Sequence, residues 1–354
     1  MDYQIIENEA YLNQIQSQIK ENNWSELEVG KIISEQKGSY LLRGGQGEEY
    51  RAELLGHLSY AAESRYDLPA VGDWVVFVTF DEDMAIIHGV LPRKSILERT
   101  HAGKKKDIQI IATNIDTALI VMGADRDFNL NRMERYVTLC HSSGIIPVVV
   151  VTKADLLEEQ EFIDLIGLLQ DRLDETIFYA ISSVTGLGIE ALKKQLKPGQ
   201  TYCLLGSSGA GKSTLINTLS GKELMETGAI SSHVNKGKHT TTHRELLELP
   251  NGAFIIDNPG MREVGIGSAG EGLGETFESI EELSEECRFK DCKHLDEPGC
   301  KVLEGLEEGM ISQASYDNYQ KMIRETQHYE STEFDRRKKG KALASLIKTH
   351  KKTK

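Results

Sequence analysis

Short apolar runs separated by glycines characterise the chain between residues 26 and 97. Five of these runs read LEVGKII, GSYLLRG, EYRAELLG, VGDWVVFVTF and MAIIHGVLP. Runs of this length, rich in branched and aromatic residues and bounded by glycine, are typical of β-strands. Five strands in so short a segment predict a small antiparallel barrel. An OB-type barrel fits the number and the length, although composition does not distinguish it from other small barrels. The polar residues 1–25, with scattered Ile and Leu, predict one short helix.

From residue 116 onward, apolar runs alternate with amphipathic segments. The predicted strands are TALIVM, IIPVVVVT, TIFYAIS, TYCLLG and AFIID, and the predicted helices are NLNRMERYVTLCHSSG, EEQEFIDLIGLLQDRL, GIEALKKQL and KSTLINTLSG. Strands that alternate with helices predict a mostly parallel sheet covered by helices on both faces. The stretch before them, RKSILERTHAGKKKDIQIIATN, is interpreted as a basic connector.

The predicted fold is therefore a multidomain α/β protein, and 354 residues suffice for two or three domains. We expect an N-terminal segment and barrel at residues 1–97 and an α/β domain at 98–274. The sequence then becomes helical and acidic, which predicts a helical domain at 275–335, followed by a basic tail at 336–354.

Composition and charge narrow the class of protein. Hydrophobic residues make up 39% of the chain and charged residues 27%, and no run of 18 apolar residues occurs. The acidic N-terminus, MDYQIIENEA, has no apolar signal core, so we expect a cytoplasmic protein with no membrane partner.

The charge is distributed unevenly along the chain. The net charge is −14, but the tail after Asp335 carries nine Lys or Arg residues and no acidic one, which leaves −23 on the rest. An acidic body with a basic tail suggests that the tail contacts a polyanion. A solvated tail without a specific partner would have the same composition.

A phosphate-binding loop is the clearest chemical signal. GSSGAGKST follows the strand TYCLL, precedes a helix and has the spacing G-x-x-x-x-G-K-[ST]. The glycines let backbone N–H groups face phosphate oxygens, and the helix adds the positive end of its dipole. Lys212 is expected to reach the β- and γ-phosphates as a catalytic group, and Ser213 to bind Mg²⁺. The predicted nucleotide contacts are Gly206, Ser207, Ser208, Gly209, Ala210, Gly211, Lys212, Ser213 and Thr214.

Two downstream segments complete the predicted phosphate site. In DNPG, which ends the strand AFIID, Asp257 is placed to hold Mg²⁺ through water and Gly260 to sense the γ-phosphate. A threonine of KGKHTTTHREL is expected to complete the Mg²⁺ shell when a triphosphate is bound. Thr241 is the first choice, with Thr240 and Thr242 as its neighbours.

A guanine-reading loop is predicted upstream of the phosphate loop. In TKAD, which follows the strand IIPVVVV, Asp155 is placed to accept hydrogen bonds from the two donors on the Watson–Crick edge of guanine. Adenine presents the opposite pattern, so this loop is expected to select GTP over ATP, and the Lys153 stem is expected to pack on the base. The backbone of SSVTG, which follows TIFYAI, is expected to complete the pocket, although alone this stretch is an ordinary turn sequence. The predicted base contacts are Thr152, Lys153, Ala154, Asp155, Ser182 and Ser183.

Three of the five cysteines cluster with a histidine in CRFKDCKHLDEPGC. Three sulfurs and one imidazole form a closed tetrahedral set that suits structural Zn²⁺ and leaves no position open for catalysis. In a protein expected to be cytoplasmic, this cluster indicates a metal rather than a disulfide. The predicted zinc ligands are Cys287, Cys292, His294 and Cys300. Cys140 and Cys203 lie in apolar surroundings and are predicted to be core residues.

The order of the motifs is a circular permutation of the usual GTPase order, because the guanine loop precedes the phosphate loop. With the barrel, DNPGMRE, the Cys/His cluster and RRKKGK, the chain resembles the circularly permuted bacterial GTPases that depend on the small ribosomal subunit. The resemblance covers nearly the whole chain. It implies hydrolysis of GTP to GDP and phosphate, binding to the small subunit and its ribosomal RNA late in assembly, and stimulation by the subunit. We expect a monomer with one structural zinc and Mg²⁺ bound with GTP.

Two positions depart from the general GTPase pattern. Thr152 stands where Asn is usual, and a hydroxyl replaces only part of the hydrogen bonding of an amide, which weakens the grip on the base. Met261 follows DNPG, where a water-orienting Gln is common, and a thioether cannot orient water. The resemblance suggests His239 as the catalytic group that assists the attacking water, with His243 as runner-up. Either histidine could instead be an ordinary surface residue.

Two other functions stay open on the sequence alone. A GTP-liganded RNA-binding scaffold with negligible turnover is favoured by Met261. A nucleotide kinase or ATPase would share the phosphate loop, but TKAD and HTTTH disfavour it.

Overall fold

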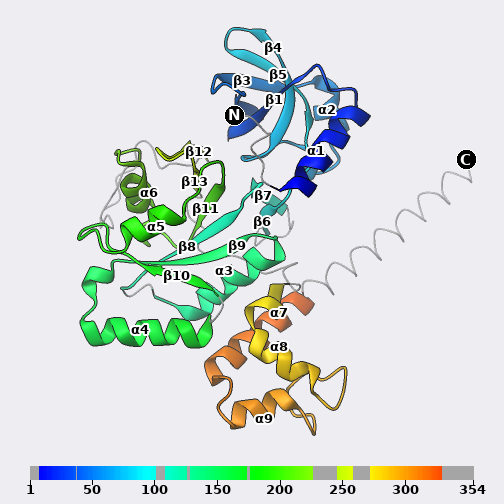
Figure 1. Cartoon of the computed structure of the whole chain (residues 1–354). Helices are drawn as coiled ribbons and strands as arrows, with labels where there is room; N and C mark the ends of the chain where they lie inside the picture. Colours follow the sequence, from blue (N-terminus) through cyan, green and yellow to red (C-terminus); the bar gives the residue numbers. More distant parts are fainter. Residues whose placement is uncertain are drawn as a thin grey trace, which may run out of the picture. The chain divides into compact units, whose positions relative to one another are not determined.

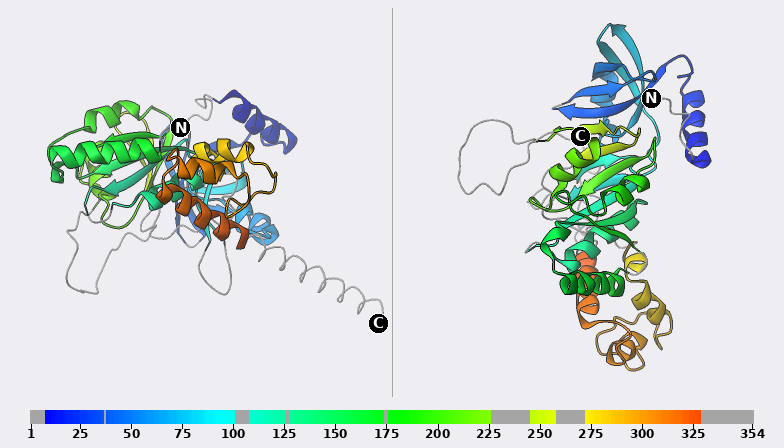
Figure 2. Two further views of the ribbon diagram at one scale, coloured as in Figure 1. Left: turned by 90° about the horizontal axis from the view of Figure 1, so that it is seen from below. Right: turned by 60° about the vertical axis from the view of Figure 1, so that its left-hand side comes forward.

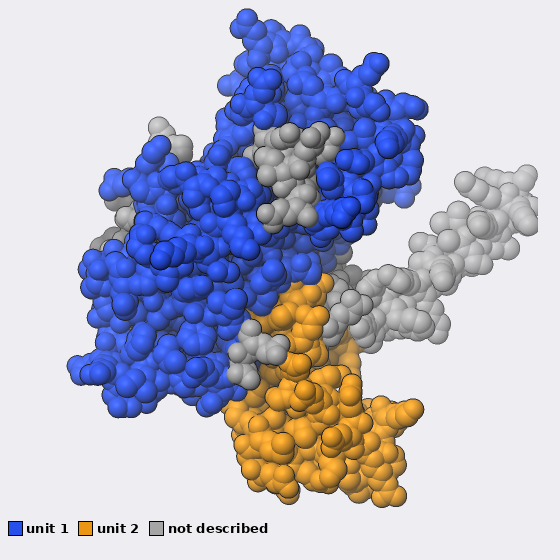
Figure 3. Space-filling view, viewed as in Figure 1, with its two compact units in different colours: residues 1–136, 143–264 blue, residues 137–142, 265–354 orange. Residues whose placement is uncertain are grey.

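The computed structural model describes residues 8–36, 38–100, 108–125, 128–173, 176–225, 245–257 and 272–328. The chain forms two compact units, one of residues 1–136 and 143–264 and the other of residues 137–142 and 265–354 (Figure 3). The first unit holds the barrel and the α/β sheet, and the second is helical. Within the described ranges, no helix has the length and hydrophobicity needed to cross a membrane.

The barrel follows the predicted strands closely. Its elements are α1 (Glu9–Glu21), β1 (Glu28–Gln36), β2 (Ser39–Arg43), β3 (Glu49–Leu54), α2 (Gly56–Ala61), β4 (Trp74–Asp81) and β5 (Met84–Val90) (Figure 1). Neighbouring strands follow the order β1-β2-β3-β5-β4, and β4 pairs back with β1, so these strands close a barrel. β3 and β5 are parallel and the other pairs antiparallel. The prediction of an OB-type barrel is confirmed.

The helix expected in residues 1–25 is α1. It begins after Asn8, whose side chain accepts a hydrogen bond from the Tyr11 N–H at 3.0 Å. Tyr11, Ile15 and Ile19 recur every fourth residue, so they share one helix face. This face packs against the outside of the barrel, with Trp74, Val76 and Leu91. The barrel interior is filled by Ile32, Tyr40, Leu42, Ala52, Val75, Phe77, Ala85 and Ile87.

The segment interpreted as a basic connector is instead a β-hairpin. β6 (Ile96–Thr100) pairs antiparallel with β7 (Ile108–Thr113). Leu97, Ile110 and Ala112 are buried, so short apolar runs at the two ends of the segment decide its structure. The prediction of a connector rested on the lysines in the middle of the segment, which lie outside the described residues.

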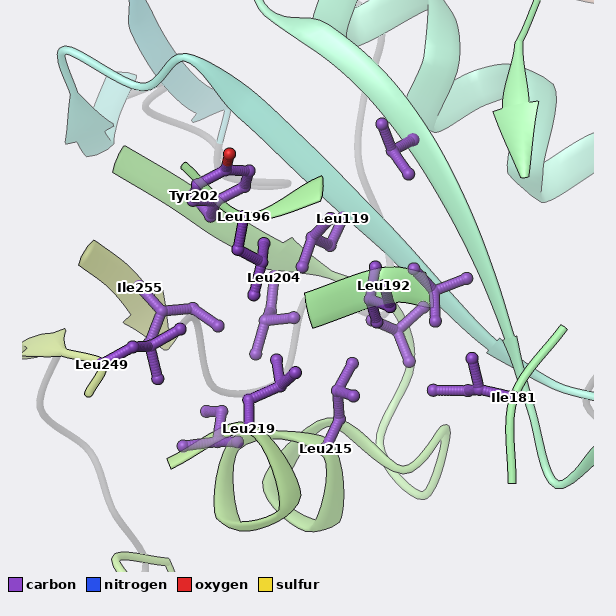
Figure 4. Packing of buried hydrophobic residues seen from close by; sticks show 14 of the residues in the cluster. Leu119, Ile181, Leu192, Leu196, Tyr202, Leu204, Leu215, Leu219, Leu249 and Ile255 are labelled. Carbon is purple, nitrogen blue, oxygen red and sulfur yellow. The ribbon is translucent and has the colours of Figure 1, made fainter. Parts of the chain in front are cut away.

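The α/β part is a mostly parallel sheet with helices on both faces, as predicted (Figures 1 and 2). Its elements are β8 (Thr117–Gly123), α3 (Leu130–Ser142), β9 (Ile146–Thr152), α4 (Glu159–Arg172), β10 (Ile177–Ala180), α5 (Ile189–Gln195), β11 (Thr201–Leu205), α6 (Lys212–Ser220), β12 (Glu245–Glu248) and β13 (Phe254–Asp257). The strand order is β10-β9-β8-β11-β13-β12, and β12, which the sequence did not predict, is antiparallel to β13. α5 and α6 cover one face, where their leucines pack on Leu119, Leu204 and Ile255 (Figure 4).

The barrel and the α/β sheet are joined by hydrogen-bonded strands. β12 pairs with β1 at Glu245 and Ser34, so that one sheet runs from β10 into the barrel. Arg43 of β2 also forms an ion pair with Glu248 of β12 at 2.9 Å. A buried lysine lies at the same junction. Lys31 Nζ on β1 donates to Thr201 Oγ1 on β11 at 2.7 Å.

Lys31 is 3% exposed, and its ammonium group lies 5.2 Å from the Trp74 ring and 5.3 Å from the Phe254 ring. Burial, assisted by the positive charge of Lys94, lowers the pKa of Lys31 to about 7. The charged form is therefore disfavoured in the folded protein, even though two aromatic faces and a hydroxyl contact it.

Replacing Lys31 with methionine is expected to remove a pH dependence of stability. An unfolded lysine has a pKa of ~10.4, so between about pH 7 and pH 10 the unfolded chain binds more protons than the folded one. The free energy of unfolding therefore rises with pH in this window. From pH 7 to pH 9 the wild type should gain on the order of 2 kcal/mol relative to Lys31→Met. Denaturant unfolding of both proteins across this range measures the difference, and parallel curves would contradict it.

The second unit is small and helical. It contains α7 (Gly272–Thr276), α8 (Glu278–Glu285), α9 (Lys301–Glu307) and a helix at residues 313–328. The end of α3 belongs to it, because Ser142 Oγ accepts a hydrogen bond from the Gly272 N–H at 3.0 Å and Thr138 Oγ1 donates to Thr276 Oγ1 at 3.0 Å. Its buried core is Leu273, Phe277, Ile280, Cys300, Val302, Ile311, Tyr319 and Met322.

Candidate functional site

The segments predicted to bind nucleotide meet at one edge of the sheet. β9 leads into TKAD, β10 into SSVTG and β11 into the phosphate loop, while β13 ends at Asp257. These strands are parallel, so their carboxyl ends share an edge. Parallel α/β sheets bind ligands at this edge. Motifs that are far apart in the sequence therefore belong to one site.

The phosphate loop has a backbone shape that depends on its glycines. Gly206, Gly209 and Gly211 have φ angles of 144°, 85° and 96°, which side chains disfavour. A Cβ atom at Gly206 would lie 2.1 Å from the carbonyl oxygen of Val121 on β8, so the loop also passes very close to the neighbouring strand. α6 begins at Lys212, which places the positive end of its dipole at the loop.

Two buried charged groups lie at the phosphate loop. Lys212 is 8% exposed, and its Nζ donates to the carbonyl oxygens of Gly206 at 2.8 Å and Ser207 at 2.6 Å. Burial raises the pKa of the Asp257 carboxyl, and the positive charge of Lys212 acts in the opposite direction. Because a bound Mg²⁺ favours the ionised carboxylate, Asp257 fits the role of a Mg²⁺-holding residue.

The guanine loop is tied directly to the phosphate loop. Thr152 is 5% exposed, and its Oγ1 donates to the carbonyl oxygen of Ala210 at 2.6 Å. Lys153 Nζ donates to the carbonyl oxygen of Gly209 at 3.0 Å. The Thr152 hydroxyl therefore links the two loops. In this structure it is buried between them.

The remaining base-pocket residues have separate roles. Asp155 is exposed at the site, where it is accessible to a base. Ser182 is fully buried, and its Oγ accepts hydrogen bonds from the N–H groups of Val184 at 3.2 Å and Thr185 at 3.1 Å. Ser182 thus shapes the SSVTG turn, whereas Ser183 is exposed on it.

The predicted nucleotide residues divide by burial. Those exposed at the loops are Asp155, Ser183, Ser208, Gly209 and Thr214, and those that are half-buried are Lys153, Gly211 and Ser213. The buried ones are Thr152, Ala154, Ser182, Gly206, Ser207, Ala210, Lys212 and Asp257. The predicted residues that lie outside the described ranges are His239, Thr240, Thr241, Thr242, His243, Gly260 and Met261.

One residue at this edge was not predicted. Asp125, just past the end of β8, forms an ion pair with Lys153, with 2.6 Å between Oδ2 and Nζ. The signal that could have found it is positional: an acidic residue directly follows the carboxyl end of a buried strand, at the edge that holds the other motifs.

The four predicted zinc ligands are brought together in the second unit. Their donor atoms all lie within 4.8 Å of one another. His294 Nδ1 is 3.6 Å from Cys287 Sγ and 3.4 Å from Cys300 Sγ, and the two sulfurs are 3.9 Å apart. Ligands bound tetrahedrally to one zinc, at ~2.3 Å for sulfur and ~2.1 Å for nitrogen, are separated by roughly 3.6–3.8 Å. The cluster therefore fits a single zinc ion.

The loop that carries the cluster is organised by hydrogen bonds around it. The Glu297 carboxylate accepts from the N–H groups of Lys293, Leu295 and Asp296, and these bonds lower its pKa to about 2. His294 has a φ of 57°, and its carbonyl oxygen accepts a hydrogen bond from the Tyr316 hydroxyl. The Lys301 N–H donates to Cys287 Sγ at 3.4 Å, which favours the thiolate that zinc needs.

Comparisons with known proteins identify the family of the chain. The family model described as RsgA GTPase matches residues 90–267. A Listeria monocytogenes protein named small ribosomal subunit biogenesis GTPase RsgA 2 is 43% identical over 318 residues, covering 87% of this chain and 88% of its own. A protein from Opitutus terrae, named small ribosomal subunit biogenesis GTPase RsgA, is 42% identical over 83% of this chain and 82% of its own.

Solved structures support the same assignment. YjeQ from Thermotoga maritima matches with a TM-score of 0.65 and 26% identity, covering 84% of this chain and 98% of its own. YloQ, described as a circularly permuted GTPase, matches with a TM-score of 0.62 and 25% identity, covering 85% and 96%. The permutation inferred from the motif order is confirmed, and the chain belongs to the RsgA GTPase family.

Proposed function

We propose that this protein hydrolyses GTP during late biogenesis of the small ribosomal subunit, and that the subunit stimulates the hydrolysis. The observation that carries the proposal is the direct bonding of the guanine loop to the phosphate loop, through Thr152 to Ala210 and Lys153 to Gly209. These hydrogen bonds hold the predicted base-reading loop next to the phosphate loop, an arrangement that suits a guanine nucleotide. Two relatives that are 43% and 42% identical to this chain are named small ribosomal subunit biogenesis GTPases.

In this proposal, each site residue has a separate role in GTP binding or hydrolysis. Lys212 neutralises charge on the β- and γ-phosphates, and the N–H groups of the glycine-rich loop bind their oxygens. Ser213, Thr241 and, through water, Asp257 would hold Mg²⁺, which would supply further charge neutralisation. Gly260 contacts the γ-phosphate, and His239 orients the attacking water, a role for which His243 is the alternative. Asp155 and Lys153 hold the base.

RNA contact is assigned to the barrel and the basic tail. The barrel class commonly binds nucleic acid. The nine basic residues of the tail are suited to phosphate contacts, whose strength falls steeply with salt. The zinc site has no open ligand position, so its proposed role is structural.

Replacing Asp155 with asparagine tests the guanine-reading role. The carboxylate accepts two hydrogen bonds from guanine, whereas asparagine offers one acceptor and one donor, which suits xanthine better. We expect GDP affinity to fall by roughly a hundredfold and xanthosine diphosphate to bind more tightly than GDP. Competition binding with the two nucleotides measures this. Unchanged preference for GDP in Asp155→Asn would exclude Asp155 as the reader of the base.

Co-sedimentation with purified small subunits tests the proposed partner. The protein is expected to sediment with the subunit in the presence of a non-hydrolysable GTP analogue, less with GDP, and progressively less as salt rises. A protein that binds GTP but does not sediment with subunits at any salt concentration or nucleotide state would exclude this partner.

A further inference from the structure

We propose that Asp125 is a positioning residue of the guanine pocket, acting through Lys153. This inference rests on the proposed guanine-nucleotide site and assigns it a residue that lies outside the sequence motifs. Asp125 Oδ2 lies 2.6 Å from Lys153 Nζ, and the same ammonium group donates to the carbonyl oxygen of Gly209 at 3.0 Å. One ammonium group thereby connects the end of β8, the guanine loop and the phosphate loop.

The backbone of Lys153 explains why an anchor is needed. Its φ angle of 60° lies in the left-handed region, which costs a residue with a side chain free energy unless its surroundings fix it. The Lys153 side chain is fixed at its far end by Asp125 and Gly209. With the ammonium group held there, the aliphatic stem between the two fixed ends becomes a preformed wall for a base to pack on.

Thr152 stands where GTPases usually have asparagine, and this makes the link between the two loops through Lys153 more important. An asparagine side chain has two donor hydrogens and an acceptor, whereas threonine has one donor, which Thr152 uses on the carbonyl oxygen of Ala210. The chain from Asp125 through Lys153 to Gly209 supplies another link between the same two loops. Asp125 thus compensates for hydrogen bonding that a threonine cannot provide.

The end of β8 is shaped to accept this ion pair. A Cβ atom at Gly123 would lie 2.8 Å from Asp125 Oδ1 and 3.5 Å from Lys153 Nζ. The space left by the absent side chain is therefore where the ion pair sits. Gly123→Ala is a second way to displace the Asp125 carboxylate, without changing any charge.

The test compares GDP with inorganic tripolyphosphate, which can occupy a phosphate loop but has no base. Asp125→Asn removes a negative charge near an anion site, so electrostatics alone would leave binding of both ligands unchanged or tighter. Positioning through Lys153 predicts the opposite for GDP, a loss of roughly three- to tenfold in affinity, with no loss for tripolyphosphate. Gly123→Ala should weaken GDP binding in the same selective way.

Two further proteins complete the experiment. In a Lys153→Met background, Asp125→Asn should have no additional effect on GDP affinity, because the group it acts through is gone. Glu248→Gln is the matched control. Glu248 lies on β12 and is ion-paired with Arg43 of β2. It pairs with Phe254 at the start of β13, at the opposite end of that strand from Asp257. Glu248→Gln should leave GDP binding unchanged. Thermal melting of every variant without ligand checks that the fold persists.

The possible outcomes distinguish failure of this inference from failure of the proposed function. Selective loss of GDP affinity that disappears in the Lys153→Met background supports Asp125 as a positioning residue. Unchanged GDP affinity, equal loss for tripolyphosphate, or the same loss in the Lys153→Met background would overturn it. Failure of the wild-type protein to bind GDP would instead overturn the proposed function itself.

Discussion

Lys212→Ala is expected to lower GTP turnover by roughly a hundred- to a thousandfold, the range seen when one preorganised group that stabilises transition-state charge is removed. Lys212 is buried, and its ammonium group is oriented by the carbonyl oxygens of Gly206 and Ser207. Alanine removes the charge and leaves these two acceptors facing a void. Because the same charge attracts the β- and γ-phosphates, nucleotide affinity is expected to fall as well.

Steady-state hydrolysis and GDP binding should be measured for Lys212→Ala beside Lys222→Ala. Lys222 is an exposed lysine just past the end of the same helix, so its replacement changes the net charge equally without touching the loop. Lys222→Ala should behave like the wild type. Turnover by Lys212→Ala within about threefold of wild type would contradict the assignment of the phosphate loop.

Loss of zinc is the second large effect expected, and it concerns the second unit. Four ligands come from one loop between α8 and α9, and the apolar core around them is small. Zinc bound to small structural sites contributes about 10–16 kcal/mol, comparable to the ~5–15 kcal/mol that stabilises a whole domain. Removing the metal by chelation, or with Cys300→Ser, should therefore unfold this unit. GDP binding by the first unit should persist.

Elemental analysis and circular dichroism measure this prediction. The wild type should contain one zinc per chain, and Cys300→Ser close to none, with a loss of helical signal. Cys203→Ala is the control, because Cys203 is a buried cysteine of β11 outside the cluster. It should keep its zinc. Gently purified wild type without zinc, or Cys300→Ser with full zinc and unchanged unfolding, would contradict the structural role.

Local patterns were sufficient to predict most elements of the fold. The five barrel strands and the alternating strands and helices each carry a strong periodic signal in their own residues. The closure of the barrel by β1 and β4 involves positions such as Val29 and Val76, whose pairing no local pattern encodes. β12 was missed because its four residues are too short to show a period and are held in place by pairing with β13 and β1.

In the nucleotide site, too, local motifs could be predicted from the sequence, whereas contacts between distant segments could not. Gly206, Lys212 and Asp155 belong to motifs whose spacing reflects the chemistry, so the sequence alone indicated them. The bond from Thr152 to Ala210 and the ion pair from Lys153 to Asp125 link residues that are distant in the sequence. Lys31 shows most clearly which contacts cannot be predicted from the sequence. It interrupts an apolar strand like a surface residue, yet Trp74, Phe254 and Thr201 from three other strands cover it.

GTP hydrolysis with and without purified small ribosomal subunits, at low and moderate salt, tests the central claim most directly. We expect turnover to rise at least about tenfold with subunits, equivalent to roughly 1.4 kcal/mol of the barrier, and the stimulation to weaken as salt rises. Tight GTP binding with no stimulation at any salt concentration would contradict the account, and would indicate a scaffold that uses GTP as a ligand.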